Sequence, residues 1–593
     1  MNHAACYKQG YPRPRFVRES FLSLNGEWDF AFDDKRAGER KGWYKKGVSE
    51  RKITVPFACQ TEASGIGDDG RHECVWYSRP LSYALPAGKR LLLHFEGADY
   101  FTKVWLNGRM LGTHKGGYAR FTFDLTDYLK KGENLLVVRC EDRPSLEQPR
   151  GKQRYVERNT SCFYTDTTGI WKSVWLEEVS DIYLESVTAL CEYENCCELF
   201  EYRVSGWRKG LSLTVEAYWK GKKVASVTQE LFAEYGRIRL DLTLFSEVLC
   251  IKPWSAGRPS QFFDVRYILR ENGKVTDEVG SYAGLVDYRA KENAIQINYL
   301  PNTYFRMVLD QGYFPGSGLT PVSDEQLLKD VLLIKEMGFN GVRKHQKIED
   351  ERFYYFCDMV GLYCWLEMPA VYDFTPESAA ALSAEWAEIV RQHAGYLSIM
   401  AYVPLNESWG ILQTAENKRM QQFSAGLYGL TKALDPTRLV ISNDGWEHTV
   451  SDVITLHNYA RTGQEIRQAY ADLPAFLRGE LTGDLHTRTA FADGWEYGGQ
   501  PVLLSEFGGI ALERDVKEGW GYGDAAASGE ELLARMRDLI EGVLAISGCQ
   551  GYCYTQLTDV MQEKNGLLTE DRTPKAPLAK IRELNGICRK EEK

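Results

Sequence analysis

The sequence has no long apolar run and no long run of basic residues. No stretch of roughly 18 apolar residues occurs, which excludes a helical membrane span. Residues 1–16 lack the apolar core and the cleavage site of a secretory signal. The net charge of −10 is spread along the chain, whereas a nucleic-acid surface needs clustered cations. We therefore expect neither a membrane nor a nucleic-acid partner.

The 14 cysteines are scattered, and no two of them have the C-x-x-C spacing. Common zinc and redox sites use such pairs, so the sequence predicts neither kind of site. In a chain without an export signal, free thiols are the default state. These features together predict a cytoplasmic protein with reduced cysteines.

At 593 residues the chain is too long for one hydrophobic core, because single cores stop growing at ~250–300 residues. Residues 1–180 contain short alternating apolar runs, and Asn107 and Gly108 between two of these runs indicate a hairpin. This pattern predicts a jelly-roll β-sandwich. Residues 181–288 continue with a shorter set of strands, a length typical of an immunoglobulin-like β-sandwich.

Residues 289–593 alternate between strand and helix patterns. A helix is expected to begin after the N-cap Ser323 and to stop at Gly338, and further helices are expected over 348–360 and 376–394. Eight segments have strand patterns: 303–309, 340–344, 362–367, 398–405, 439–442, 453–456, 502–505 and 551–556. Repeated βα units predict a (β/α)8 TIM barrel. The rival is an open doubly wound sheet, which is disfavoured because no G-x-G-x-x-G follows an early strand.

Two glutamates follow the fourth and the seventh of these strand segments. Glu407 comes after 398–405, and Glu506 comes directly after 502–505. Active sites of TIM barrels lie at the carboxyl ends of the strands, where a carboxylate is partly desolvated and suited to proton transfer. Two facing carboxylates are what glycoside hydrolysis requires. A pair of buried structural salt bridges is the alternative, and the matched strand-end positions favour catalysis over it.

Several segments of the first 180 residues resemble a known family. They are SLNGEWDF (23–30), FEGA (95–98), VWLNGRMLG (104–112), GY (117–118) followed by FTFDL (121–125), and TGIWKSVWLE (168–177). Together with the sequence around Glu407, they resemble glycoside hydrolase family 2, the family of β-galactosidases, β-glucuronidases and β-mannosidases. The resemblance implies a retaining exo-β-glycosidase in which Glu407 is the acid/base and Glu506 is the nucleophile.

The resemblance also implies sugar-binding residues at the strand ends. Asn406 is similar to the residue that bonds the sugar 2-hydroxyl, although asparagine is also a common turn residue. Tyr459 is similar to the tyrosine that donates a hydrogen bond to the nucleophile, with plain packing as its alternative. The other polar candidates are Arg343, His345, Glu367, Asp444 and Gln556. The aromatic candidates for stacking on a sugar face are Trp409, Trp446 and Tyr554.

Two departures from the family pattern concern residues that would reach the sugar. Galactosidases and glucuronidases of the family place an aspartate where this chain has Phe163, and the nearest acid is Asp166, which becomes the candidate. The eighth strand of the family usually ends with a tryptophan, whereas this chain has Tyr554, followed by Gln556. The missing aspartate keeps furanosides among the candidate substrates.

A third departure concerns the sugar carboxylate of glucuronides. Glucuronidases of the family carry an Asn-x-Lys pair for it, and the matching stretch here has Glu563, Lys564 and Asn565. A uronate would face an acid without its cation, a repulsive arrangement. The sequence therefore favours a neutral sugar, and the resemblance implies a β-galactosidase-like activity because that is the commonest activity in the family. The alternatives are a furanosidase (β-galactofuranosidase or α-L-arabinofuranosidase), a β-glucuronidase or β-galacturonidase and, as a different class, a non-catalytic carbohydrate-binding protein.

The sequence predicts no metal site. Glu349, Asp350, His393 and His457 do not have ligand spacing on one helix face. Some relatives use Mg²⁺ beside the acid/base, but no ligand set for it is recognisable in this sequence. We expect a carbohydrate substrate and no cofactor, and the sequence is compatible with a homo-oligomer.

Overall fold

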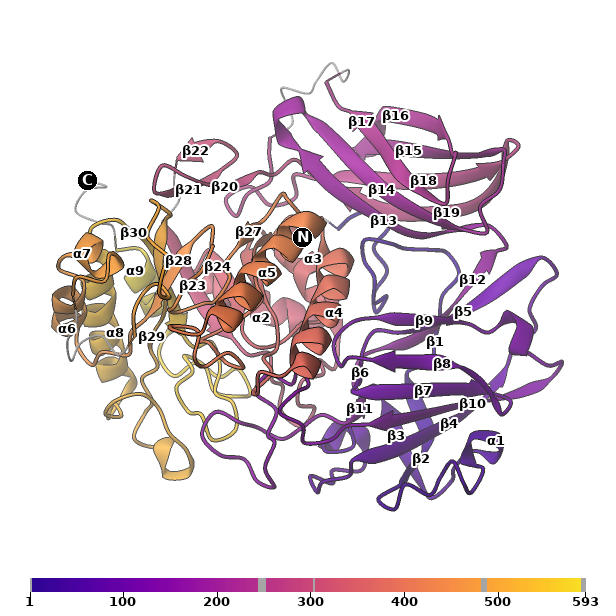
Figure 1. Cartoon of the computed structure of the whole chain (residues 1–593), viewed down its shortest axis with the longest axis horizontal. Coiled ribbons are helices and arrows are strands. Elements are labelled where there is room, and N and C mark those ends of the chain that lie inside the picture. The colour runs from indigo at the N-terminus through magenta and orange to yellow at the C-terminus, as the bar shows by residue number, and fades with distance from the viewer. Residues whose placement is uncertain (1–2, 244–251, 302–303, 482–487, 588–593) are drawn as a thin grey trace.

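The N-terminal part of the chain forms a β-sandwich of two antiparallel sheets (Figure 1). The computed structural model describes residues 3–243, 252–301, 304–481 and 488–587. The first sheet has the order β1 (Leu22–Ser23), β12 (Val174–Ser180), β5 (Lys89–Phe95) and β9 (Phe121–Asp124). The second has the order β3 (Arg51–Val55), β2 (Gly26–Phe32), β4 (Cys74–Ser82), β10 (Glu133–Glu141), β7 (Phe101–Leu106) and β8 (Arg109–Lys115). Apolar side chains of both sheets, such as Leu91 and Val138, meet in one core.

The hairpin between β7 and β8 is confirmed. Asn107 and Gly108 join the two strands with φ angles of 54° and 77°. Positive φ at both central positions is the backbone conformation that an Asn-Gly hairpin favours. A short helix, α1 (Trp43–Lys46), and a two-stranded ribbon of β6 (Ala98–Asp99) and β11 (Gly169–Ile170) complete this sandwich.

A second β-sandwich follows, with three strands facing four. One sheet has the order β13 (Tyr183–Glu192), β14 (Cys197–Ser205) and β17 (Tyr235–Asp241). The other has the order β16 (Lys222–Glu230), β15 (Leu211–Trp219), β18 (Phe263–Glu271) and β19 (Lys274–Ala283). Its core includes Phe200, Leu213 and Val215 from the two sheets. A small sheet of β20 (Tyr288–Lys291), β21 (Ala294–Ile297) and β22 (Leu300–Pro301) leads from it to the barrel.

The eight predicted barrel strands are all present in the described residues, as one parallel sheet. In chain order they are β23 (Phe305–Asp310), β24 (Gly341–Lys344), β25 (Tyr363–Glu367), β26 (Ile399–Val403), β27 (Leu439–Val440), β28 (Ile454–His457), β29 (Val502–Gly508) and β30 (Cys549–Thr555). The sheet order is β27-β26-β25-β24-β23-β30-β29-β28, so consecutive strands are neighbours. At the seam between β27 and β28, the amide of Asp452 donates to the carbonyl of Val440 at 2.9 Å. The sheet thus curls into the expected TIM barrel.

Helices surround this sheet (Figure 1). They are α2 (Asp324–Glu336), α3 (Glu351–Val360), α4 (Pro376–His393), α5 (Lys418–Leu434), α6 (Gly463–Ala469), α7 (Leu473–Leu477), α8 (Gly529–Leu544) and α9 (Leu578–Asn585). The Ser323 hydroxyl caps α2 by accepting from the Gln326 amide, as predicted. The helix expected from residue 348 begins instead at Glu351, because the Asp350 carboxylate caps it by accepting from the Arg352 amide.

One strand end differs from its prediction in a way that matters for the site. The segment 398–405 was expected to be a strand throughout, yet β26 stops at Val403. The next residue is Pro404, which has no amide hydrogen for a strand ladder. Glu407 therefore lies in a turn beyond the strand, whereas Glu506 lies within β29 itself.

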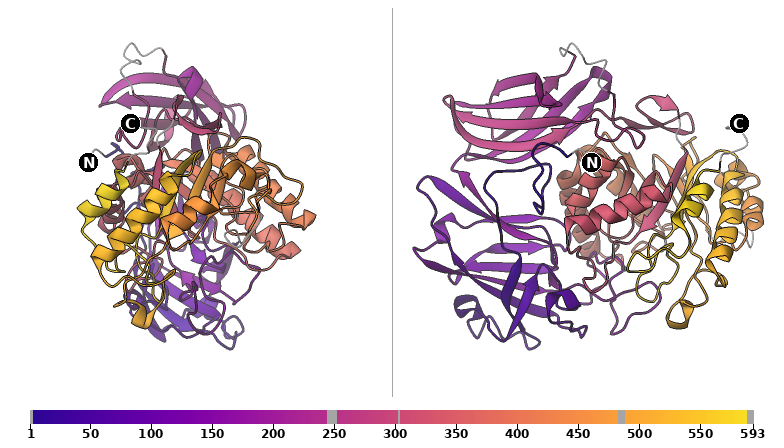
Figure 2. Two further views of the ribbon diagram at one scale, coloured as in Figure 1. Left: turned by 90° about the vertical axis from the view of Figure 1, so that its left-hand side faces the viewer. Right: turned by 180° about the vertical axis from the view of Figure 1, so that it is seen from behind.

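The N-terminal segment before β1 packs outside the first sandwich. The amide of Ala5 donates to Asp264 Oδ1 at 2.7 Å in the second sandwich, and the Tyr7 hydroxyl donates to Asp324 Oδ2 at 2.7 Å in the barrel. Viewed from behind, the indigo trace runs from beside the barrel to the first sandwich (Figure 2). None of the described helices has the length and apolar composition that crossing a bilayer requires.

Candidate active site at the barrel mouth

The two candidate catalytic glutamates differ in backbone conformation, because one lies in a strand and the other in a turn. Glu506 lies in β29 and is 5% exposed. Glu407 and Ser408 lie in a turn with left-handed φ angles of 50° and 57°. The Glu407 amide donates to the carbonyl of Asp444 at 2.8 Å, and the Ser408 amide donates to Asn443 Oδ1 at 2.9 Å. These bonds hold a backbone conformation that costs non-glycine residues energy, a feature concentrated at functional sites.

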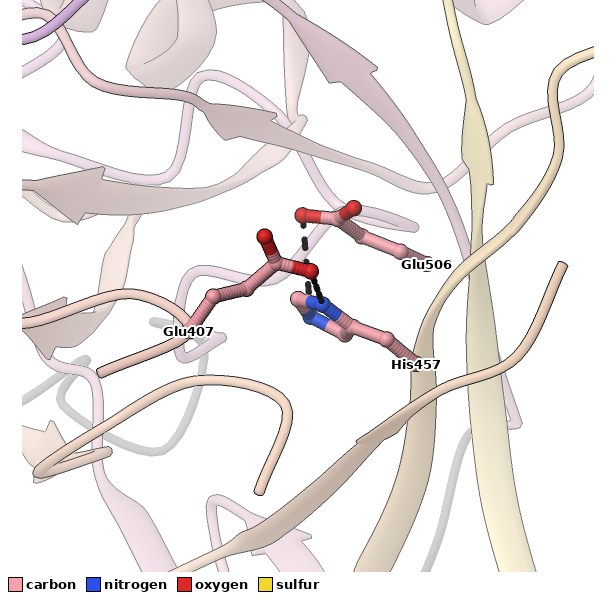
Figure 3. A group of neighbouring side chains, drawn as sticks. All are labelled: Glu407, His457 and Glu506. Carbon is pink, nitrogen blue, oxygen red and sulfur yellow. Dashed lines mark hydrogen bonds and ion pairs between the residues drawn. The ribbon is translucent and has the colours of Figure 1, made fainter. Parts of the chain in front are cut away.

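The carboxylates of Glu407 and Glu506 face each other across His457 (Figure 3). One oxygen of each carboxylate and one ring nitrogen of His457 lie within 4.8 Å of one another. Retaining glycosidases hold their carboxyl groups about 5–5.5 Å apart, and inverting enzymes about 6.5–9.5 Å apart. The observed geometry fits a nucleophile and an acid/base that act on the same anomeric centre without an intervening water.

His457 is a cation between three carboxylates. Its Nδ1 donates to Glu407 Oε1 at 2.7 Å and its Nε2 donates to Asp444 Oδ2 at 3.0 Å, while Glu506 Oε1 lies 3.6 Å from Nε2. Burial lowers the pKa of His457, but the charges of Glu506 and Asp444 outweigh burial and raise it to about 10. A metal ion would need a lone pair on this ring, and both nitrogens are engaged with carboxylates. The cluster therefore fits an imidazolium better than a metal.

Arg343 in β24 connects most of the remaining predicted residues. The guanidinium is fully buried and contacts Glu506 Oε1, Asp444 Oδ2 and Glu367 Oε2, each at 2.7 Å. It also donates from Nη2 to Asn406 Oδ1 at 2.8 Å. The structure thus brings together residues from the ends of five strands, β24 to β27 and β29, as TIM-barrel sites do. His345, two residues after Arg343, lies with its Nδ1 2.9 Å from Glu367 Oε1.

The surroundings of Glu506 favour its ionised form. Burial alone would raise the pKa of Glu506, but the neighbouring charges of His457 and Arg343 hold it below its usual range. Tyr459, which the sequence predicted to donate to the nucleophile, donates from its hydroxyl to Glu506 Oε2 at 2.5 Å. A buried carboxylate that stays ionised, with one oxygen near the partner glutamate, is suited to nucleophilic attack.

An aromatic wall lines one side of the mouth. The Trp409 ring centroid lies 5.8 Å from that of Phe163 and 5.5 Å from that of Tyr372. Phe163 belongs to a loop of the first sandwich, so both domains contribute to this wall. Trp446 lies on another side, with its ring 5.4 Å from that of His457. Trp409 and Trp446 are half-buried and stay candidates for stacking on a sugar or its aglycone.

Tyr554 does not face the mouth, contrary to the stacking role considered for it. It is fully buried, and its ring packs edge-on against Phe507 at 5.4 Å. Side chains alternate along a strand, so its neighbour Thr555 points inward instead, with Oγ1 3.1 Å from the Tyr459 hydroxyl. Tyr554 is a core residue between the strands and the helices.

Asp166 and Gln556 belong to other networks. Asp166 accepts from Arg154 Nε at 2.9 Å inside the first sandwich, and no contact of it with Glu407 or Glu506 occurs in the described structure. Gln556 is fully buried and donates from Nε2 to Asn565 Oδ1 at 2.6 Å. A direct role of Asp166 in sugar binding is therefore disfavoured, because its carboxylate is already committed to an arginine.

The sequence did not single out two residues that the structure places at the site. His457 ends β28 and was considered only as a metal ligand, although the strand-end argument used for the glutamates applies to it equally. Lys152 lies in a loop of the first sandwich, and its ammonium is 3.9 Å from Glu563 Oε2 at the barrel mouth. No pattern in the sequence indicates that this loop reaches the barrel.

We expect His457 to make stability pH-dependent. A histidine whose folded pKa is raised from 6.5 to about 10 stabilises the fold fully below pH 6.5, and this contribution is lost as pH rises through about 10. The stability advantage of the wild type over His457→Gln should therefore shrink steadily between about pH 6.5 and pH 10. Urea unfolding at several pH values measures this difference. A difference that does not change with pH would contradict a charged His457.

Comparisons with known proteins agree with this architecture. The family models described as "Glycosyl hydrolases family 2, sugar binding domain" and "Glycosyl hydrolases family 2, TIM barrel domain" match residues 21–179 and 317–511. The chain belongs to glycoside hydrolase family 2. It is therefore a glycoside hydrolase, as the sequence predicted.

Relatives of this family-2 enzyme are named β-glucuronidases. A "putative beta-glucuronidase" of Formosa agariphila is 25% identical over 547 residues, which cover 86% of this chain and 63% of that protein. This chain thus spans less than two thirds of that relative's length. The β-glucuronidase of Sus scrofa is 23% identical, with 76% of this chain and 73% of that protein covered. These names favour the glucuronidase alternative over the β-galactosidase-like prediction.

Solved structures show the same fold. The Bifidobacterium dentium β-glucuronidase complexed with coumarin-3-O-glucuronide has a TM-score of 0.77 at 21% identity, with 98% of this chain and 99% of that chain covered. The apo β-glucuronidase of Ruminococcus gnavus has a TM-score of 0.78 at 18% identity, with 96% and 99% covered. The jelly-roll sandwich and the TIM barrel expected from the sequence are confirmed.

Proposed function

We propose that this family-2 enzyme is a retaining exo-β-glucuronidase that removes terminal β-glucuronosyl residues. The observation that carries the retaining mechanism is the pair of facing carboxylates, whose oxygens lie within 4.8 Å with His457 and Arg343 beside them. The choice of a glucuronide over a neutral sugar is supported by the names of the relatives. The limits of the three domains, the cytoplasmic location and a homo-oligomeric state stay predictions.

The proposed reaction is a double displacement. A Glu506 oxygen attacks the anomeric carbon while the bond to the aglycone oxygen breaks, and Glu407 gives its proton to that departing oxygen. Glu407 then takes a proton from a water molecule, whose oxygen attacks the anomeric carbon and releases the Glu506 carboxylate. Tyr459, Arg343 and His457 stabilise the negative charge on Glu506 before attack and after release.

Asn406 is the proposed partner of the sugar 2-hydroxyl. Its Oδ1 accepts from Arg343, which fixes the orientation of the amide. Its Nδ2 is buried and has no hydrogen-bond partner among the described residues. A buried donor without a partner is costly, so a substrate hydroxyl that accepts from it would gain binding energy.

A panel of 4-nitrophenyl glycosides tests the proposed substrate. We expect kcat/KM for the β-glucuronide to exceed the values for β-galactoside, β-galactofuranoside and α-L-arabinofuranoside by at least about 10-fold, because a charge-assisted contact to the carboxylate contributes about 1.5–3 kcal/mol. A β-galacturonide in the same panel separates the two uronides. A neutral glycoside with the highest kcat/KM would refute the glucuronidase proposal, and any turnover removes the binding-protein alternative.

A further inference from the structure

A loop of the first sandwich that contains Arg150 and Gly151 packs against the barrel mouth. The Arg150 amide donates to the carbonyl of Ala370 at 3.0 Å, and the Tyr372 hydroxyl donates to the carbonyl of Gly151. Gly151 has a φ of 57°, and a Cβ at this position would stand 2.4 Å from the carbonyl oxygen of Gln346. Only glycine permits this close approach, so the residue that follows Gly151 enters the mouth at a fixed point.

That next residue is Lys152, and its backbone is fixed from the other side as well. Its carbonyl accepts from the Tyr164 amide at 2.9 Å. The neighbouring Gln153 donates from Nε2 to Asp99 Oδ2 at 2.8 Å and to the Tyr118 hydroxyl at 3.1 Å. Because both flanks are anchored, little conformational freedom of the Lys152 backbone remains to be lost on binding a ligand.

The Lys152 ammonium has N–H groups that are free to donate hydrogen bonds to a ligand. Its side chain is 11% exposed, and its ion pair with Glu563 spans 3.9 Å, longer than a hydrogen bond. Among the described residues it donates no hydrogen bond, although an ammonium carries three donors. Glu563 already accepts from the Tyr164 hydroxyl, from Gln311 Nε2 at 3.2 Å and from Asn565 Nδ2 at 3.0 Å.

Lys152 is also within electrostatic reach of the catalytic residues. Burial alone would lower its pKa, but Glu563 and, less strongly, the catalytic Glu506 and Glu407 raise it. The ammonium therefore stays charged at neutral pH. Lys564, the lysine of the stretch expected to contact a uronate, instead lines a groove together with Arg514 and Asp571.

The position of Lys152 across the barrel matches the geometry of a pyranose. Asn406 follows β26 and Glu563 follows β30, and four steps separate these strands in the eight-stranded order. The two residues thus lie on opposite walls of the mouth. In a pyranose ring, C5, which carries the C6 group, stands across from C2. A sugar whose 2-hydroxyl contacts Asn406 therefore directs its C6 group toward Lys152.

We infer that Lys152, supplied by the first sandwich, binds the C6 carboxylate of a β-hexuronide in the active site. This assignment rests on the proposed glucuronidase function and names its specificity-determining cation. It also accounts for the repulsion expected from Glu563, because the Lys152 ammonium, 3.9 Å from Glu563 Oε2, offsets the charge of that carboxylate. The alternative is that Lys152 only neutralises the buried charge of Glu563.

The test compares 4-nitrophenyl β-glucuronide with its methyl ester, which has the same sugar and leaving group without the charge. In the wild type we expect kcat/KM for the acid to exceed that for the ester. Lys152→Met should lower kcat/KM for the acid about 10- to 100-fold and leave the value for the ester within about 3-fold, since one charge-assisted contact is lost. Lys152→Arg, which keeps the charge, should retain most of the preference for the acid.

The double variant Lys152→Met/Glu563→Gln separates the two roles of Lys152. It removes both charges of the pair, so no unpaired buried carboxylate remains to destabilise the fold. Continued loss of the acid preference in this variant supports the inference. A return of that preference, or an unchanged acid-to-ester ratio in Lys152→Met, overturns the inference and leaves the glucuronidase proposal standing. A wild type that hydrolyses neutral glycosides but neither form of the glucuronide overturns both.

Discussion

Replacing Glu506 by glutamine is expected to reduce kcat by at least about 10³-fold, because the amide cannot form the covalent glycosyl intermediate. Glutamine preserves the shape of the side chain, and the Tyr459 hydroxyl can still donate to its carbonyl oxygen. The negative charge beside His457 and Arg343 disappears, however, so the site loses both its nucleophile and a partner of two cations. Steady-state kinetics on the activated 4-nitrophenyl glucuronide measure the loss.

A matched control distinguishes chemistry from folding. Glu513 lies seven residues further along the same segment and is exposed to solvent. Glu513→Gln should therefore keep wild-type kcat and melting temperature, since exposed substitutions away from special features change stability by less than about 0.5 kcal/mol. If Glu506→Gln retains more than about one per cent of wild-type kcat, another residue is the nucleophile.

The barrel and the two facing carboxylates at its mouth could be predicted because both depend on local sequence. Each strand is a short apolar run, and a residue at its carboxyl end points to the mouth whatever the loops do. The same reasoning applied to His457 at the end of β28 would have placed it at the site. The prediction that Tyr554 faces the sugar was wrong because side chains alternate along a strand, and the side chain of its neighbour Thr555 points to the mouth instead.

Lys152 could not be predicted, because its position depends on contacts between residues far apart in the chain. Gly151 and Tyr372, whose hydrogen bond docks the loop on the barrel, are separated by 221 positions. The neutral-sugar prediction rested on the stretch from Glu563 to Asn565, where the family's cation is missing, with Arg343 as the second possible partner of a uronate. The cation at this wall of the mouth comes from another domain, and only the folded structure reveals it.

Replacing Glu407 by alanine is expected to harm substrates in proportion to the basicity of their leaving groups. An aglycone that departs as a strongly basic alkoxide needs the proton of Glu407, and general acid catalysis contributes about 10²- to 10⁴-fold. An alkyl glucuronide should therefore lose that factor in kcat/KM. A dinitrophenyl glucuronide leaves as a stable anion, so its kcat/KM should fall by less than about 10-fold.

The second half-reaction gives an independent test of the same residue. Without Glu407 no base activates the water, so the glycosyl intermediate on Glu506 should accumulate, and kcat and KM for the dinitrophenyl glucuronide should fall together. Azide needs no base and can enter the space left by the side chain, so it should restore kcat and give the β-glucuronosyl azide.

Glu407→Ala removes the carboxylate that lies 2.7 Å from Nδ1 of the buried His457, so the melting temperature of the variant must accompany these rates. If the folded variant loses kcat/KM by the same factor for both leaving groups and azide does not restore its kcat, Glu407 is not the general acid/base. The acid/base would then have to be sought among the other carboxylates around Arg343. Of these, Asp444 is the less suited, because Arg343 and His457 outweigh its burial and hold its pKa far below the usual range.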